Sequence, residues 1–417
     1  MLLEEDDTVN DDFSLLATLI VEEEEDRPAA RRGSMPGHAV IHRGRAEGHE
    51  RLYRDYFAET PTYPPNIFRR RFRMNRSLFL RILSAVEGFD PYFAQKRDAI
   101  GVPGLSSLQK VTAALRILAY GASADSVDDY VRIGKSTAIE SVKRFVRAII
   151  ALFHEQYLRL PNNEDVIRLL AMNERRGFPG MLGSIDCMHW KWKNCPTAWQ
   201  GMYTGHIQEP TMILEAVASQ DLWIWHAFFG LPGSLNDLNV LDRSPLFNEL
   251  AEGRAPPVNY TINGNNYSIG YYLADGIYPS WSTFVKTIPA PQGNKRQFFA
   301  KAQESARKDV ERAFGVLQSR FAIVRGPALY WEIDTLSDIM RACVILHNMI
   351  VEDERDHYGI NFNYDTIEGY TPPNISHSLI PETMEYVDTY YRIRNRQSHS
   401  QLQADLVEHL WQLHGGE

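Results

Sequence analysis

The chain has 417 residues, of which 44% are apolar and 23% charged, a composition typical of a soluble globular protein. This length allows two or three domains. Its three cysteines are too few for a disulfide framework, and no uncharged apolar run reaches the 18 residues of a membrane span. We therefore expect a protein of a reducing compartment, cytosol or nucleus, that has no membrane partner.

The net charge of -9 is distributed unevenly along the chain. Residues 1–26 carry eleven acids and no Lys or Arg, whereas the segment 27–73 holds eleven Arg and four acids. Such a pattern indicates either a solvated disordered terminus or an acidic tail that shields a basic arm. We predict that residues 1–60, the acidic tail and the basic arm, are mostly disordered.

Apolar periodicity predicts a helical domain over residues 61–165, with helices near 66–73 and 77–87 and more throughout 106–160. Thr137 and Glu140 have capping-box spacing at the start of a long helix that carries Lys143, Arg144 and Arg147 opposite its apolar face. Two short helices around a glycine-bearing turn, with a basic second helix, are typical of a helix-turn-helix. A three-helix bundle with a solvated basic face explains the same pattern.

From about residue 178 the periodicity changes to that of strands. The stretches GMLGSIDCM, TMILEAVASQ and LWIWHAFFG predict three strands, and Asn263-Gly264 predicts a tight turn between two more. A further strand, WSTFVKTI, precedes helices predicted at 300–322 and 333–355. We expect an α/β layer domain over residues 175–355, followed by a mostly irregular tail over 356–417 with one helix at 403–413.

Three acids stand out by their context. Asp186 lies within an apolar strand, Asp275 ends another, and Glu311 lies on the helix of 300–322. Helical geometry does not choose between Glu311 and Asp309, although Gly315 leaves room one turn beyond Glu311. Carboxylates at strand ends, joined by one from a helix, can hold divalent cations such as Mg²⁺ for phosphodiester cleavage.

Four motifs resemble those of the PIF/Harbinger superfamily of DDE transposases. In chain order they are GSIDCMHWKWKNCPTAWQG, GLPGSLNDLNVLDRSPLF, YYLADGIYPSWSTFVKTI and DVERAFGVLQSRFAIVRGPALYW. The resemblance covers residues 66–355 and is strongest over 178–355. It implies a ribonuclease-H-like mixed-sheet catalytic domain preceded by an all-α helix-turn-helix domain, with Asp186, Asp275 and Glu311 as the catalytic, metal-binding triad. Asp237 also matches a family motif, as a further metal ligand or a helix cap.

The resemblance also implies a reaction. A divalent metal, Mg²⁺ with Mn²⁺ as the alternative, would support cutting of a transposon end, and the released 3′-hydroxyl would join target DNA. Trp199 and Tyr203 would stack on a base or pack internally, and Cys187, His189, Cys195 and His206 fit no common zinc spacing. The candidate contacts to double-stranded DNA are Lys135, Lys143, Arg144, Arg147, Lys191 and Lys193.

Two other functions remain open beside the active transposase. A domesticated relative would bind DNA or a chromatin complex without cutting, and a plain interaction protein would have its three acids far apart in space. Family membership implies a separate Myb-like partner, and a homo-oligomer is expected. The run RRRFR at 69–73 is a candidate nuclear-import patch, so we expect the nucleus, with the cytoplasm as a second compartment.

Overall fold

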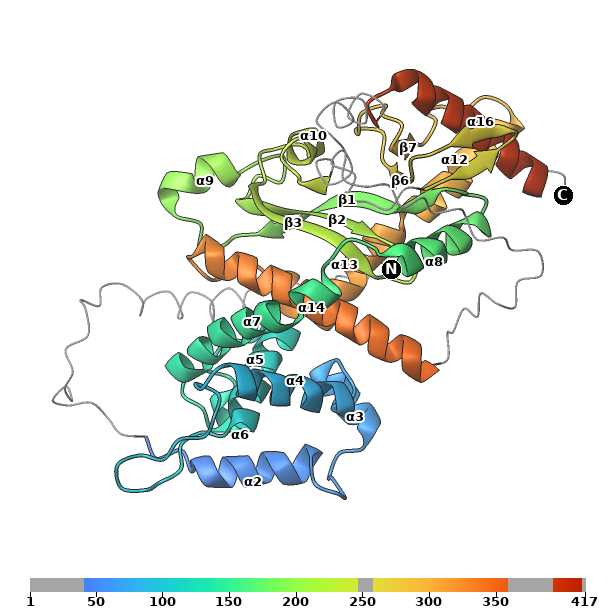
Figure 1. Ribbon diagram of the computed structural model, residues 1–417. Coiled ribbons are helices and arrows are strands. Elements are labelled where there is room, and N and C mark those ends of the chain that lie inside the picture. The colour runs from blue at the N-terminus through green and yellow to red at the C-terminus, as the bar shows by residue number, and fades with distance from the viewer. Residues whose placement is uncertain (1–40, 247–257, 359–392, 415–417) are drawn as a thin grey trace, which may run out of the picture.

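The computed structural model describes residues 41–246, 258–358 and 393–414, and shows a helical unit beneath a layer built on a mixed sheet (Figure 1). The long helix α14 (Ile333–Tyr358) lies between the two. No helix in these ranges is both long enough and apolar enough to cross a membrane.

The helical unit follows the predicted pattern closely. Ser106 caps α5 through a reciprocal capping box with Gln109, and Gly121 ends that helix in a left-handed conformation at φ 61°. The predicted capping box of Thr137 and Glu140 is wrong, because the helix already begins at Lys135, after Gly134. The helices are α2 (Arg45–Tyr56), α3 (Pro65–Phe72), α4 (Arg76–Phe89), α5 (Ser107–Tyr120), α6 (Asp128–Val131), α7 (Lys135–Tyr157) and α8 (Asn163–Glu174).

The prediction of disorder up to residue 60 is wrong for α2. This helix is polar overall, but it buries Leu52 and Tyr56 completely or nearly so. The Tyr56 ring packs edge-to-face on Phe72 of α3, with 5.2 Å between ring centroids. Two well-placed apolar side chains are enough to fix a helix whose average composition indicates disorder. Residues 1–40 lie outside the described part of the chain.

The predicted strands form one five-stranded mixed sheet and a separate hairpin. The sheet order is β3-β2-β1-β6-β7, in which β1 is antiparallel to β2 and parallel to β6. This mixed α/β architecture, preceded by helices, agrees with the predicted ribonuclease-H-like fold. The strands are β1 (Met181–Lys191), β2 (Thr211–Ala218), β3 (Ile224–Pro232), β6 (Tyr271–Ala274) and β7 (Phe284–Lys286), with the hairpin β4 (Tyr260–Ile262) and β5 (Asn265–Tyr267).

The helices around the sheet differ from prediction in their bounds. The helix expected at 300–322 is two helices, which break at Lys308, where ψ is -1°. The helix expected at 403–413 is longer, whereas residues 359–392 of the predicted irregular tail lie outside the described ranges. The remaining elements are α9 (Thr197–Tyr203), α10 (Asp237–Leu241), α12 (Asn294–Arg307), α13 (Asp309–Arg320), the 3₁₀ helix η1 (Ala322–Val324) and α16 (Arg396–His414).

One hydrophobic core runs through both the helical unit and the sheet layer. Phe145 and Ile149 of α7, Ile339 of α14 and Trp190 of β1 all belong to the same buried cluster. The contact between α7 and α14 carries this core from one unit to the other. The sheet therefore rests on a helical base, and this arrangement fixes the orientation of its strand ends.

Candidate functional site

Asp186 lies on the sheet face that is covered by α13 and α14. On β1 it shares a face with Met188 and Trp190, which enter the core shared with those helices, whereas Ile185 points to the other face. In the parallel pairing of β1 with β6, Ser184 lies opposite Leu273. Two further residues along that register bring Asp186 beside Asp275, which follows directly after β6. Asp186 thus lies within the central strand β1, beside the carboxyl end of its neighbour β6, which Asp275 follows.

Asp275 lies in the loop after β6, and Asp237 lies at the start of a short helix. The Asp275 carboxylate accepts a hydrogen bond from the backbone N–H of Ile277, at 2.9 Å. Asp237 is the half-buried first residue of α10. The helix-cap role considered for Asp237 belongs instead to Asn236, whose side chain accepts from the N–H of Asn239. The Asp237 carboxylate is therefore not engaged in capping α10.

The structure distinguishes Glu311 from Asp309, whereas helical periodicity alone did not. Asp309 has a side chain 1% exposed and pairs with Arg176 at 2.5 Å and with Arg312 at 2.6 Å. Glu311 is 42% exposed, on the side of α13 that faces Asp186. Beyond it, a Cβ added to Gly315 would meet nothing within 4 Å, so the space there is open as expected. Asp309 is a structural acid, and Glu311 is the accessible one.

Arg307 connects Glu311 to Asp186. Its Nη1 lies 2.9 Å from Glu311 Oε1 and 3.5 Å from Asp186 Oδ2, while its Nη2 lies 3.0 Å from Glu304 Oε1. The break at Lys308 places Arg307 at the end of α12 and Glu311 in the first turn of α13. Arg307 was missed at the sequence level. Its position one helical turn before Glu311 was the available signal.

The electrostatics of the site couple its four acids. Burial raises the pKa of Asp186 to about 6, against the opposing effects of the Cys187 N–H and the Arg307 charge, and Asp237 and Glu311 raise it further. Burial also raises the pKa of Asp237, followed by the charge of Asp275. Burial disfavours the charge on Arg307, but Glu304, Glu311 and Asp186 leave the pKa of its guanidinium above the ordinary value. These groups therefore form a negative cluster partly neutralised by one arginine.

The donor chemistry of the cluster fits a hard divalent cation. All four acids offer carboxylate oxygens, and Mg²⁺ is commonly held by one or two carboxylates with water and substrate phosphate completing the shell. Within the described ranges, however, no three His, Cys, Asp or Glu side chains are close enough together to form a ready-made site. Arg307 occupies the space between two of the candidate ligands.

The basic residues of α7 are engaged in ion pairs. Lys143 lies 3.3 Å from Glu332, which directly precedes α14, and Arg147 lies 3.2 Å from Asp338 within that helix. Arg144 pairs with Glu140 and Asp90, and Lys135 is half-buried and has a partner. This face of α7 thus lies along α14. Contact of these four residues with DNA stays a prediction.

The basic residues after Asp186 lie in more open surroundings. Lys191, at the end of β1, pairs with Glu209 at 2.9 Å, and both side chains are more than half exposed. Lys193 is exposed and makes no ion pair with any other described residue. The following loop forms the short helix α9, on which Trp199 is 41% exposed while Tyr203 is buried against Trp192. Tyr203 therefore packs internally, and Trp199 is the ring that faces solvent.

Comparison with known proteins gives the family. The profile of the plant transposon protein family matches residues 155–358, and a domain of unknown function matches residues 48–87. The first match covers just under half of the chain and, together with the relatives below, supports a Harbinger-derived, nuclease-like protein. The ALP1-like protein of Arabidopsis thaliana is 26% identical over 303 residues, which cover 70% of this chain and 72% of the relative. No solved structure matches.

Two other relatives span much of the chain. HARBI1 of Homo sapiens, by its name a candidate nuclease, is 23% identical over 60% of this chain and 69% of its own. The Arabidopsis thaliana protein named antagonist of like heterochromatin protein 1 is 24% identical over 68% of this chain and 73% of its own. The region matched by the family profile, residues 155–358, includes all four acids of the cluster.

One buried acid near the cluster, Glu215, was missed at the sequence level. Glu215 lies opposite Cys187 on β2, is fully buried, and pairs with His226 at 3.2 Å while its second oxygen has no partner among the described residues. Its negative charge contributes to the raised pKa of Asp237, after burial and the charge of Asp275. A glutamate in the apolar run TMILEAVA is unusual. That run was the available sign of a buried acid behind the site.

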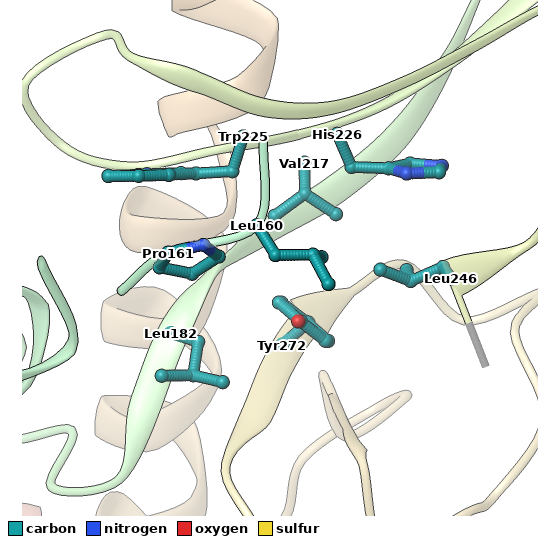
Figure 2. A pocket seen from close by; sticks show the side chains of 8 residues that line it. All are labelled: Leu160, Pro161, Leu182, Val217, Trp225, His226, Leu246 and Tyr272. Atoms are coloured by element: carbon teal, nitrogen blue, oxygen red, sulfur yellow. The ribbon is translucent and has the colours of Figure 1, made fainter. Parts of the chain in front are cut away.

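A small pocket on the other sheet face is not the site. Figure 2 shows it lined by Leu160, Trp225, His226 and Tyr272, among other residues. Its Val217 pairs with Ile185, on the opposite face from Asp186. A cavity of about 10 Å³ has room for no more than one water molecule. This pocket is therefore separate from the cluster of acids.

Proposed function

We propose that this protein is a metal-dependent DNA nuclease and transposase of the DDE type, in which Asp186, Asp275 and Glu311 hold the cation and Asp237 assists. The observation that carries the proposal is the placement of the carboxylates. Asp186 and the strand-end Asp275 belong to adjacent parallel strands, and Glu311 shares the Arg307 guanidinium with Asp186. Mg²⁺, or Mn²⁺ in its place, would activate water and stabilise the leaving oxygen of the phosphodiester.

The protein's own residues have defined tasks in this reaction. The acids would hold the cation in their ionised form, whereas burial raises the pKa of Asp186 to about 6 in the cation-free protein. Lys193 and Trp199 lie exposed beyond β1, where a backbone phosphate and an unstacked base could be held. Cutting a transposon end would release a 3′-hydroxyl, which then joins target DNA. In this proposal the substrate is double-stranded DNA and the protein acts in the nucleus. It works with a Myb-like partner and as a homo-oligomer.

A cleavage assay on transposon-end DNA with Mg²⁺ tests this function. The wild type should cut, and Asp186→Asn should cut at least about a hundredfold more slowly with DNA binding kept, since one ligand of the catalytic cation is lost. The matched control is Asp242→Asn, an exposed acid that follows α10. The assay is run with and without a Myb-like partner. Wild-type protein that binds DNA but does not cut it with the partner present would contradict the nuclease.

The alternative function is a non-catalytic DNA-binding or chromatin protein. It is favoured by the relative named as an antagonist of a heterochromatin protein. In that case Asp186→Asn and the wild type would bind DNA equally and neither would cut. Recovery of chromatin proteins with both variants alike would then favour this second function.

A further inference from the structure

The position of Arg307 is unusual for a site that is to bind a cation. One nitrogen, Nη1, lies within 3.5 Å of oxygens from both Asp186 and Glu311. The side chain is 13% exposed, so water screens its charge only partly. A guanidinium is always protonated and forms directional bonds with carboxylates. In this arrangement Arg307 supplies a positive charge to two of the proposed metal ligands.

A divalent cation and Arg307 cannot share this position. Mg²⁺ bound to carboxylate oxygens requires metal–oxygen distances of about 2.0–2.1 Å. An arginine nitrogen 2.9 Å from Glu311 Oε1 and 3.5 Å from Asp186 Oδ2 occupies the same space between the two oxygens. Two positive charges that close would also repel each other strongly. Binding of the cation between these ligands therefore requires Arg307 to move.

Glu304 offers Arg307 a place to go. Arg307 Nη2 already lies 3.0 Å from Glu304 Oε1, one turn earlier on α12. Glu304 is 41% exposed and also pairs with Lys308. The guanidinium can thus give up Asp186 and Glu311 while it keeps Glu304 as a partner. Arg307 is therefore placed to compete with the cation. Its contact with Glu304 alone is the resting position that it can take once the cation is bound.

We propose that Arg307 is a built-in counter-ion that competes with the divalent cation, holding Asp186 and Glu311 in the cation-free protein and withdrawing to Glu304 when the cation binds. The proposal rests on the proposed function, because it takes the two acids as metal ligands. It assigns Arg307 a positioning role that controls cation affinity. The cation-free form is then a closed state rather than an open cluster of repelling acids.

The test is a titration of the full-length protein with Mn²⁺ alone, followed by calorimetry and without DNA. Arg307→Gln should bind Mn²⁺ about tenfold more tightly, since one charge-assisted bond no longer has to be broken. Arg307→Lys should lie between Arg307→Gln and the wild type, because an ammonium keeps the positive charge but lacks the second nitrogen that contacts Glu304 at the same time. The control is Arg312→Gln, which removes the arginine of a neighbouring ion pair on α13 and should leave the affinity unchanged.

A second pair of variants tests the resting position. Glu304→Gln should weaken Mn²⁺ binding, because Arg307 then has no other partner of opposite charge to withdraw to. In the double variant Glu304→Gln/Arg307→Gln this weakening should largely disappear, which a double-mutant cycle measures. An equal weakening in both backgrounds would show that Glu304 acts by its own charge, and would overturn the resting position.

The outcomes separate this proposal from the nuclease proposal. If Asp186→Asn loses Mn²⁺ binding while Arg307→Gln binds no more tightly than the wild type, the competition is overturned and the metal site stands. If Asp186→Asn binds Mn²⁺ as the wild type does, the metal site itself fails, and the competition fails with it. Circular dichroism spectra check that each variant is folded, and Arg307→Lys decides the matter should Arg307→Gln unfold.

Discussion

At the scale of single residues, two acids two positions apart on α13 have opposite roles. Asp309 is buried and held by Arg176 and Arg312, whereas Glu311 is exposed beside Arg307. The apolar stripe of the helix could not distinguish them, because each lies off the stripe by a similar angle. Their difference depends on Arg176, which is 133 positions distant from Asp309 in the chain.

We expect Asp309→Asn to destabilise the fold by roughly 2–4 kcal/mol, because Arg176 then loses its buried partner. Glu311→Gln should change the free energy of unfolding by less than about 0.5 kcal/mol, since its ion pair is exposed. Urea denaturation at pH 7.5 measures both values. A larger loss for Glu311→Gln than for Asp309→Asn would contradict the assignment.

His347 is a buried group that makes the fold sensitive to acid. It is fully buried on α14, its Nε2 donates to Leu222 O at 2.8 Å, and Nδ1 faces Arg320 at 3.2 Å. Burial, together with the Arg320 charge, lowers the pKa of His347 to about 3. Below about pH 6.5 the imidazole therefore binds a proton in the unfolded chain but stays neutral in the folded protein. Its contribution to stability is complete above pH 6.5 and decreases as the pH falls towards 3.

This titration predicts a loss of about 2 kcal/mol of unfolding free energy between pH 7.5 and pH 5 that is due to His347. His347→Gln can still donate to Leu222 O and accept from Arg320, but it does not titrate. Between pH 7.5 and pH 5 this variant should therefore lose about 2 kcal/mol less unfolding free energy than the wild type. His154→Gln, at an exposed histidine of α7, is the matched control. Parallel curves for His347→Gln and the wild type would exclude this source of acid sensitivity.

At the scale of elements, α7 and the loop with α9 after β1 are the two candidate surfaces for DNA. The basic face of α7 lies along α14, with Lys143 and Arg147 paired to Glu332 and Asp338. The loop after β1 instead presents α9, which lies at the end of the sheet away from α16 (Figure 1). Residues 197–202 of α9 are all exposed. The second surface is the better candidate for contact with DNA near the acids.

We expect Trp199→Ala to weaken binding of single-stranded or distorted DNA about tenfold, the loss of one base-stacking contact. Trp199→Phe should retain most of the affinity, because a phenyl ring also stacks. Met202→Ala, at another exposed apolar residue of α9, is the control and should have little effect. Fluorescence anisotropy with labelled DNA measures the affinities. Equal losses for Trp199→Ala and Met202→Ala would indicate a general apolar contact instead of stacking.

At the scale of the whole molecule, the helical unit and the sheet share one core. Ile149 of α7 and Trp190 of β1 belong to the same buried cluster, which passes through α14. All eight tryptophans lie at or after residue 190, outside helices α2 to α8, so their fluorescence reports mainly on the sheet layer. Far-ultraviolet circular dichroism reports on both parts. The two signals can therefore show whether the parts unfold together.

A shared core predicts a single cooperative transition, with fluorescence and circular dichroism midpoints that coincide in urea. Ile149→Ala, in the helical unit, should lower the unfolding free energy seen by tryptophan fluorescence by about 2–4 kcal/mol. Leu406→Ala, in the separate cluster around α16, is a comparison within the sheet layer. An unchanged fluorescence midpoint in Ile149→Ala would show that the two parts fold independently.

Much of this protein can be read from local patterns in its sequence. Helices and strands follow from apolar periods of 3.6 and 2, which act within a few residues, and most expected elements are present. The ordered motifs around Asp186, Asp275 and Glu311 indicated the family and its fold. The helix α2 was missed because its composition is polar and its two anchoring side chains have partners elsewhere in the chain.

The tertiary structure alone decided which charges meet. Periodicity tells which side of an element a residue occupies, but the partner on that side comes from a distant part of the chain. That is why Asp309 became part of a buried ion pair, why Lys143 and Arg147 lie against one acid just before α14 and one within it, and why Arg307 lies between Asp186 and Glu311. The sequence determined which acids lie in the strand, after the strand and on the helix, and packing determined what each carboxylate faces.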